Sequence, residues 1–242
     1  MKTIDLNCDM GEVPEAVFGG AQGALMDCVT SVNIACGGHA GDASTMQATI
    51  EQALARGRAI GAHPGYPDAE NFGRLEMCFS AAEIADIVYA QVSALVGIAT
   101  RCGARVTHVK AHGALYNQAV KDGAIAQGIA DGVARWSREA VLVGLAGSPM
   151  LEVFEKNGFR IAAEAFADRR YEPDGTLRSR KFPDALIRDP AEAAEHALKI
   201  VQSGHPAAQT ICIHGDTPGA LDIAYAVAGR LCSAGVRLES LG

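Results

Sequence analysis

A short segment in the middle of the chain, THVKAHGALYN at residues 107–117, alternates titratable side chains with small or apolar ones. In an extended strand His108, Lys110 and His112 share one face, and the intervening Val and Ala share the other. A buried lysine needs a charged partner, so this face is either a solvated sheet edge or the lining of a site. The imidazole and ammonium groups indicate acid–base chemistry or anion binding, with His108, two residues deeper, more typical of a core histidine.

Other segments also place polar side chains where an apolar run ends. They are DLNCDMGE (Asp5–Glu12), NIACGGHAGD (Asn33–Asp42), GAHPGYPD (Gly61–Asp68) with a following NFGR, EAFADRRY (Glu164–Tyr171) and CIHGD (Cys212–Asp216). Such a set can perform general acid–base catalysis at a polar bond. The candidate catalytic residues are Asp9, His63, Lys110, His112, Glu164, His214 and Asp216. The candidate substrate-binding residues are Asn7, Asn33, Gly38, His39, Arg74, Asp168 and Arg169.

Several of these motifs have a second interpretation. Gly37–Gly38 allows close backbone approach to a ligand, whereas Cys36 is either a nucleophile or, more typically, a small core residue. Asp42 is a candidate helix cap, and His214 and Asp216 are spaced to form an orienting pair.

A metal site is left open by the sequence. The candidate metal ligands are Asp9, His39 and His63. Their residue types suit a zinc or hard-metal site, but they lack a diagnostic local spacing such as H-E-x-x-H.

Composition narrows the class of protein. The chain has 242 residues, 49% of them hydrophobic and 20% charged, which is typical of a globular protein with a sizeable core. A net charge of −7 without a basic run argues against a nucleic-acid partner. No apolar stretch reaches the roughly 18 residues of a membrane helix, and the first residues lack a signal-peptide pattern. Seven scattered cysteines predict reduced thiols in a cytoplasmic protein.

Short β-like runs alternate with helical patterns along the whole chain, which predicts a mostly parallel sheet in a single domain over residues 1–242. The expected strands are Thr3–Asp9, Ser31–Cys36, Ala59–His63, Val106–Lys110, Ala140–Leu145, Arg160–Phe166 and Thr210–His214, with a further candidate at Val236–Leu241. Helices of about 12 to 20 residues are expected between them. Polar residues at the ends of six strands favour a (β/α) barrel over a doubly wound sheet.

Local signals mark the starts of four helices and one long loop. Ser80–Glu83 has the pattern of a capping box, and Ser148–Pro149, Asp189–Pro190 and Thr217–Pro218 each place a good N-cap before proline. The charged segment from Phe166 to Ala185 is expected to be an ordered loop over the site. The nucleotide-binding patterns G-x-G-x-x-G after the first strand and G-x-x-x-x-G-K-[ST] are absent from the sequence.

Taken together, the motifs resemble the lactam-utilisation family, described as the A subunit of 5-oxoprolinase. The resemblance covers nearly the whole chain, with the motifs in the family's order. It implies a seven-stranded TIM-like barrel similar to polysaccharide deacetylase and glycoside hydrolase-type barrels. It also implies ATP-dependent opening of the 5-oxoproline lactam to L-glutamate, with ATP as co-substrate together with Mg²⁺, and action with subunits B and C. The family reads V-K-P-H-G-A-L-Y-N where this chain has Ala111 in place of the proline.

In a mechanism consistent with this resemblance, Lys110 binds the anionic phosphoryl and carboxylate groups together with Arg74 or Arg169. Asp9 or Glu164, with His63 or His214, would then handle the protons of water and of the ring nitrogen. Two other functions fit the same residues: a metal-dependent amide hydrolase or deacetylase without ATP, and a non-catalytic binding subunit whose partners hold the catalytic groups.

Overall fold

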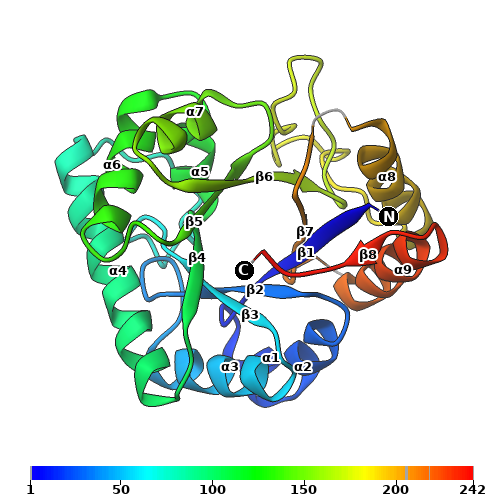
Figure 1. Cartoon of the computed structure of the whole chain (residues 1–242), viewed down its shortest axis with the longest axis horizontal. Helices are drawn as coiled ribbons and strands as arrows, with labels where there is room; N and C mark the ends of the chain where they lie inside the picture. Colours follow the sequence, from blue (N-terminus) through cyan, green and yellow to red (C-terminus); the bar gives the residue numbers. More distant parts are fainter. Residues whose placement is uncertain (1, 205–206, 218, 242) are drawn as a thin grey trace.

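Seven parallel strands close into a barrel in the structure, a computed structural model that describes residues 2–204, 207–217 and 219–241 (Figure 1). The strands are β1 (Thr3–Met10), β2 (Ser31–Ala35), β3 (Ala59–His63), β4 (Val106–Lys110), β5 (Val141–Leu145), β6 (Arg160–Phe166) and β7 (Thr210–Ile213). Each strand pairs in parallel with the next in the chain, and β7 pairs with β1 to close the ring. The predicted seven-stranded barrel is confirmed, and the predicted bounds of β3, β4 and β6 match those observed.

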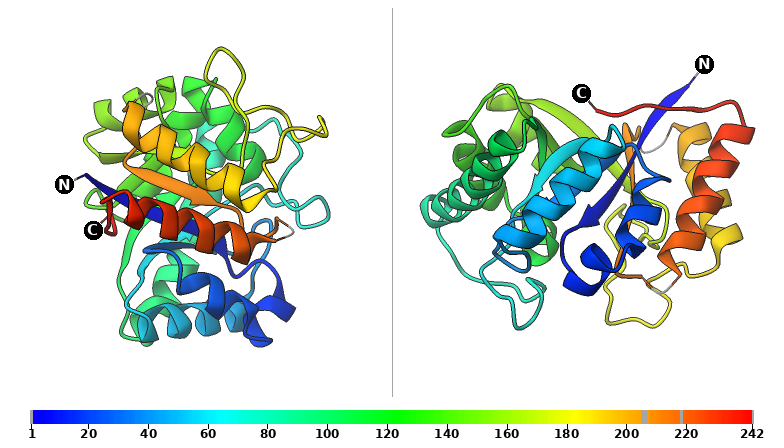
Figure 2. Two further views of the ribbon diagram at one scale, coloured as in Figure 1. Left: turned by 90° about the vertical axis from the view of Figure 1, so that its right-hand side faces the viewer. Right: turned by 90° about the horizontal axis from the view of Figure 1, so that it is seen from below.

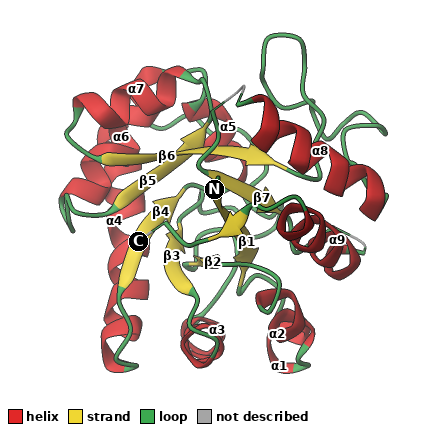
Figure 3. Cartoon of the chain, turned by 45° about the vertical axis from the view of Figure 1, so that its right-hand side comes forward, coloured by secondary structure: helices red, strands yellow, loops and turns green. Residues whose placement is uncertain are grey.

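Helices surround this barrel on its outer side (Figure 3). They are α1 (Pro14–Phe18), α2 (Ala21–Met26), α3 (Ala43–Ala55), α4 (Ala81–Arg101), α5 (Gly113–Ala119), α6 (Gly123–Ala134), α7 (Pro149–Lys156), α8 (Pro190–Ser203) and α9 (Ala220–Ser233). The helices α1, α2, α5 and α7 are shorter than the expected length of about 12 to 20 residues. In two connections, after β1 and after β4, a pair of short helices replaces one long helix.

The two ends of the barrel differ. A two-residue strand, β8 (Arg237–Leu238), pairs with the beginning of β1 and crosses the end of the barrel that faces the viewer in Figure 1. The long loops after β3 and β6 project from the opposite end (Figure 2), where the strands have their carboxyl ends. The loop after β6 is ordered as predicted, with the Arg170 amide donating to the Ala185 carbonyl and Tyr171 bridging to Leu177.

Three of the predicted helix N-caps are confirmed. Ser80 and Glu83 form the predicted capping box, Asp189 caps α8, and Asp42 caps α3. Each cap satisfies a backbone N–H that lacks a partner within the helix.

One predicted N-cap, Thr217, is wrong, and another, Ser148, is at the predicted position but makes no side-chain hydrogen bond to the helix. Ser148–Pro149 does begin α7, but the Ser148 hydroxyl donates to the Leu145 carbonyl instead of capping the helix. In Thr217–Pro218, whose second residue lies outside the described residues, the Thr217 hydroxyl donates to Asp168, and α9 is capped at Gly219. In neither case does the hydroxyl oxygen accept a hydrogen bond from an amide of the described helix residues.

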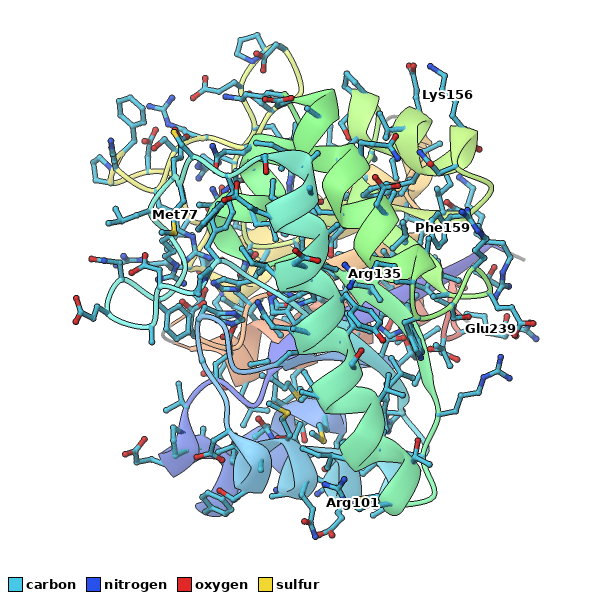
Figure 4. The ribbon with its side chains drawn as sticks, turned by 90° about the vertical axis from the view of Figure 1, so that its left-hand side faces the viewer. Met77, Arg101, Arg135, Lys156, Phe159 and Glu239 are labelled. Carbon is cyan, nitrogen blue, oxygen red and sulfur yellow. The ribbon has the colours of Figure 1, made fainter. Side chains whose placement is uncertain are left out.

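One helix of the described residues, α4, is long and apolar enough by length and composition alone to cross a membrane, with a mean hydropathy of 1.4. In this fold it lies along the outside of the barrel, with Arg101 at its carboxyl end (Figure 4), and packs on α6. Gly128 and Gly132 of α6 allow this close approach, because a Cβ on either would lie within 3 Å of Ile84 or Val88 of α4. The apolar face of α4 is thus used for helix packing.

The barrel interior contains a buried histidine. His108 Nε2 lies 3.0 Å from Asn33 Oδ1, and its Nδ1 lies 3.0 Å from the Thr107 hydroxyl. Gly61 on β3 makes room for it, since a Cβ there would lie 2.2 Å from His108 Nε2. The interpretation of His108 as a core residue is confirmed by its complete burial.

His108 should make the protein sensitive to acid. Burial, together with Lys110 and His63, lowers the pKa of His108 from 6.5 to about 3. Between these values the unfolded chain binds a proton here and the folded chain does not, so the free energy of unfolding falls as the pH falls. His108→Asn should therefore reduce the loss of stability between pH 6.5 and 4.5 by about 2 kcal/mol. Urea denaturation at both pH values measures this, and an unchanged pH dependence in the variant would contradict it.

Candidate active site

Most of the predicted site residues converge at the carboxyl end of the barrel. Asn7 and Asp9 lie on β1, Asn33 on β2, His63 on β3, Lys110 on β4 and Glu164 on β6, while His39, His112, Asp168 and Arg169 follow strand ends. All of these side chains are buried. They alternate with apolar residues because successive strand positions face the interior and the helices in turn.

Lys110 is held by two carboxylates inside the barrel. Its Nζ lies 3.0 Å from Asp9 Oδ1 and 2.9 Å from Glu164 Oε1, and the residue is only 2% exposed. Burial favours the neutral amine, but Asp9 and Glu164 raise the pKa of Lys110 well above its usual value. The ammonium is therefore charged, and the protein's own carboxylates neutralise it.

The Asp9 carboxylate joins this network to the histidines. Its Oδ1 accepts from Lys110 and from Asn33 Nδ2, while its Oδ2 lies 3.3 Å from His63 Nε2. Although burial favours the neutral acid, His63 and Lys110 hold the pKa of Asp9 well below its usual value. Asp9 is thus an ionised carboxylate that lines a cavity of about 280 Å³ together with Glu12 and Asp216.

Three imidazoles and Glu12 form a compact cluster beside Asp9. The rings of His39 and His112 stack with centroids 3.5 Å apart, and His63 stands at right angles to both. Glu12 Oε1 lies 2.9 Å from His39 Nε2 and 3.3 Å from His112 Nδ1. Burial lowers the pKa of His39 and of His112, whereas Asp9 outweighs burial and raises the pKa of His63.

Glycines allow the loop after β3 to close over these rings. Gly73 adopts a positive φ of 62°, and a Cβ there would lie 2.7 Å from His39 Cβ. A Cβ on Gly65 would lie 2.8 Å from His39 Nδ1. Gly38, by contrast, is buried against the Gln91 side chain and is not part of the lining of the cavity.

His214 is oriented by a different carboxylate from the one predicted. Its Nδ1 lies 2.9 Å from Asp168 Oδ1, and its backbone amide donates to Asp168 Oδ2. The predicted His214–Asp216 pair is therefore wrong. Asp216 lies beyond the end of β7, where it pairs with Arg74 and Arg180 at the rim.

Arginines supply the positive charge at this rim. Arg74 follows β3 and Arg180 lies in the loop after β6, so Asp216 connects three loops across the barrel mouth. Arg169 is buried, and its Nε has no hydrogen-bond partner among the described residues. Burial, reinforced by Arg180, lowers the pKa of Arg169 to about 10, but the guanidinium remains charged at neutral pH.

The cysteines near the site are neutral thiols. Burial raises the pKa of Cys36 to about 12 and that of Cys212 well above its usual value. This favours the interpretation of Cys36 as a core residue over that of a nucleophile, which would need a thiolate. Cys212 Sγ lies 3.0 Å from Lys110 Nζ and completes the surroundings of the ammonium.

Comparison with known proteins identifies the family of this chain. Residues 4–242 match the model of the LamB/YcsF family. The chain belongs to the LamB/YcsF family. A curated relative from Methylococcus capsulatus, named as the A subunit of 5-oxoprolinase, is 45% identical over 251 residues, which cover 100% of this chain and 96% of that protein.

Solved structures support the same family and fold. A lactam utilization protein from Thermus thermophilus has a TM-score of 0.91 and 38% identity, with 100% of both chains covered. The polysaccharide deacetylase Bc1974 from Bacillus cereus has a TM-score of 0.53 and 13% identity, covering 100% of this chain and 93% of that one. This second likeness shows a shared barrel fold. The LamB/YcsF family thus has the TIM-like barrel expected from the sequence.

Three contributors to the LamB/YcsF site were absent from the predicted set: Glu12, Arg180 and Cys212. Glu12 lies two residues beyond the end of β1, after Gly11 with its positive φ of 78°, and Cys212 shares the inward face of β7 with Thr210. The position of Cys212 follows from strand alternation, whereas that of Glu12 depends on the bend at Gly11. Arg180 lies within an irregular loop, where no periodic signal locates a side chain.

Replacing Lys110 should destabilise the barrel, because it leaves two buried carboxylates without their cation. Lys110→Met should lower the free energy of unfolding by about 3–5 kcal/mol. Combining it with Glu164→Gln should restore part of this loss, giving a coupling energy of about 1–3 kcal/mol in urea denaturation. The exposed pair of Arg105 and Glu139 is the matched control, for which Arg105→Met and Glu139→Gln should couple by under about 1 kcal/mol. Equal coupling in the two pairs would contradict the role given to Lys110.

Proposed function

We propose that this chain is the subunit of an ATP-dependent 5-oxoprolinase that opens the 5-oxoproline lactam to L-glutamate. The name of the 45% identical relative supports this activity and describes a subunit, so the proposal includes partner subunits B and C. ATP with Mg²⁺ is the proposed co-substrate, and the cytoplasm the proposed location. The main structural support is the ionised, buried Asp9 at the wall of a cavity, with imidazoles on either side of it.

The reaction requires acid–base groups on both sides of a stable amide. Transfer of the ATP γ-phosphoryl group to the lactam oxygen gives ADP and activates the ring carbon. Water then bonds to that carbon, and the C–N bond breaks as the ring nitrogen gains a proton, which leaves an acyl phosphate. A second water bonds to the same carbon and phosphate leaves, which gives the side-chain carboxylate of L-glutamate. Asp9 with His63 is the proposed base for water. His214, oriented by Asp168, is the proposed acid for the ring nitrogen, since Asp9 and His214 offer atoms within 4.8 Å of each other.

We assign the binding of the substrates' anionic groups to the arginines at and near the rim. Lys110 is already neutralised by Asp9 and Glu164, so its proposed role is to keep Asp9 ionised. Arg169 has an unpartnered Nε, and Arg74 and Arg180 share one carboxylate, Asp216. Guanidinium groups with spare donors suit phosphoryl and carboxylate oxygens.

The test is glutamate formation from 5-oxoproline, with phosphate release from ATP followed in parallel. The chain together with subunits B and C should be active, and Asp9→Asn should lower kcat by at least about 100-fold because the base is lost. Asp86→Asn, on the exposed outer face of α4, is the matched control and should leave kcat unchanged. Thermal melting confirms that both variants are folded.

Two results would overturn this proposal. Near-normal turnover by Asp9→Asn would place the chemistry on a partner subunit. Lactam opening by the chain alone, without ATP, would instead favour an ATP-independent amide hydrolase.

A further inference from the structure

We propose that Glu12, His63 and His112 form a divalent-metal site whose open coordination position faces the cavity beside Asp9. The three potential ligand atoms, with one from His39, all lie within 4.8 Å of one another. The inference concerns metal binding and does not require the lactam reaction, but with a metal bound His63 Nε2 would be a ligand, and Asp9 alone would be the base for water.

Backbone carbonyls fix the proton positions on two of the imidazoles. His63 Nδ1 lies 2.7 Å from the Lys110 carbonyl oxygen, and His112 Nε2 lies 2.9 Å from the Phe72 carbonyl oxygen. A carbonyl oxygen only accepts, so each of these ring nitrogens must carry a hydrogen. In the neutral imidazoles the lone pairs are then on His63 Nε2 and His112 Nδ1.

Those two lone-pair nitrogens face each other. His63 Nε2 and His112 Nδ1 are 3.0 Å apart. Glu12 Oε1 adds a third acceptor, 3.3 Å from His112 Nδ1 and 3.9 Å from His63 Nε2. These three converging acceptors, with Asp9 Oδ2 also 3.3 Å from His63 Nε2, repel one another unless positive charge lies among them. A shared proton bridges one pair, whereas a metal cation satisfies all three.

The charges around Glu12 also favour a bound metal cation. Among the described residues its ion-pair partners are the three histidines, with no lysine or arginine. The carboxylate is only 7% exposed, and a buried carboxylate without a permanent cation is costly. A divalent ion supplies the missing charge.

The surroundings match those of known metal ligands in two respects. Metal-binding histidines usually donate their other ring N–H to a carbonyl or carboxylate, as His63 and His112 do here. His39 stacks on His112 with the rings 3° from parallel, so the two cannot both point their lone pairs at one ion. Its Nε2 instead lies 2.9 Å from Glu12 Oε1 and acts as a positioning group for that ligand.

Two imidazoles and one carboxylate favour Zn²⁺ or another first-row transition metal over Mg²⁺ or Ca²⁺, which prefer all-oxygen sets. Three protein ligands leave a position for water or substrate, as in catalytic zinc sites. Glu12 and Asp9 both line the adjacent cavity, so that position is reached from it. A bound metal would supply a Lewis acid there.

The test uses the full chain, stripped with a chelator and titrated with Zn²⁺, Mn²⁺ and Mg²⁺ by calorimetry. We expect one Zn²⁺ or Mn²⁺ per chain and much weaker Mg²⁺ binding. Glu12→Gln and His112→Asn should each weaken binding by at least about 100-fold, and His39→Asn by about 10- to 100-fold. His196→Asn, on α8, is the matched control and should leave the affinity unchanged.

A second measurement needs no variant. The X-ray absorption spectrum of the Zn²⁺-loaded native chain should show two imidazole ligands. Undiminished binding by Glu12→Gln or His112→Asn, or a spectrum without imidazole, would overturn the proposal. Failure of the native chain to bind Zn²⁺ or Mn²⁺ would also overturn it and leave a shared proton between His63 and His112.

Discussion

The ion pairs of Lys110 with Asp9 and Glu164 are the interaction on which the site depends. They connect β4 with β1 and β6, strands that lie on different sides of the barrel. A shift of one residue in the register of β4 would turn the lysine toward the helices and leave both carboxylates without a cation. The cost of burying charge thus fixes the relative positions of three strands, and with them the residues that follow each strand.

Asp9 transmits this constraint to the imidazoles. One of its oxygens accepts from Lys110 and Asn33, and the other faces His63. The interior therefore has layers: Asp5 with Ser31 and Thr210 at the bottom, the Lys110 network in the middle, and the histidine cluster at the mouth. Hydrogen bonds also join the bottom and middle layers, because Asn7 Nδ2 donates to both Thr210 Oγ1 and Glu164 Oε1.

Sequence reasoning located single residues better than it located pairs. The strands that carry Asp9, His63 and Lys110 were predictable because each apolar run ends in polar side chains. The partner of His214 was not, because Asp168 lies on a different loop and reaches it only when β6 and β7 are adjacent. Arg180 was missed for the same reason, since its contact with Asp216 depends on how an irregular loop closes across the mouth.

The pairing of β8 with β1 has a consequence for how the molecule can be connected to other proteins. The Arg237 amide donates to the Lys2 carbonyl, so the first described residue lies beside β8. Both ends of the described chain lie at the end of the barrel opposite the long loops after β3 and β6 (Figure 2). A tether or fused polypeptide joined at either end therefore extends away from the mouth, and the loops around the cavity remain accessible from their outer side.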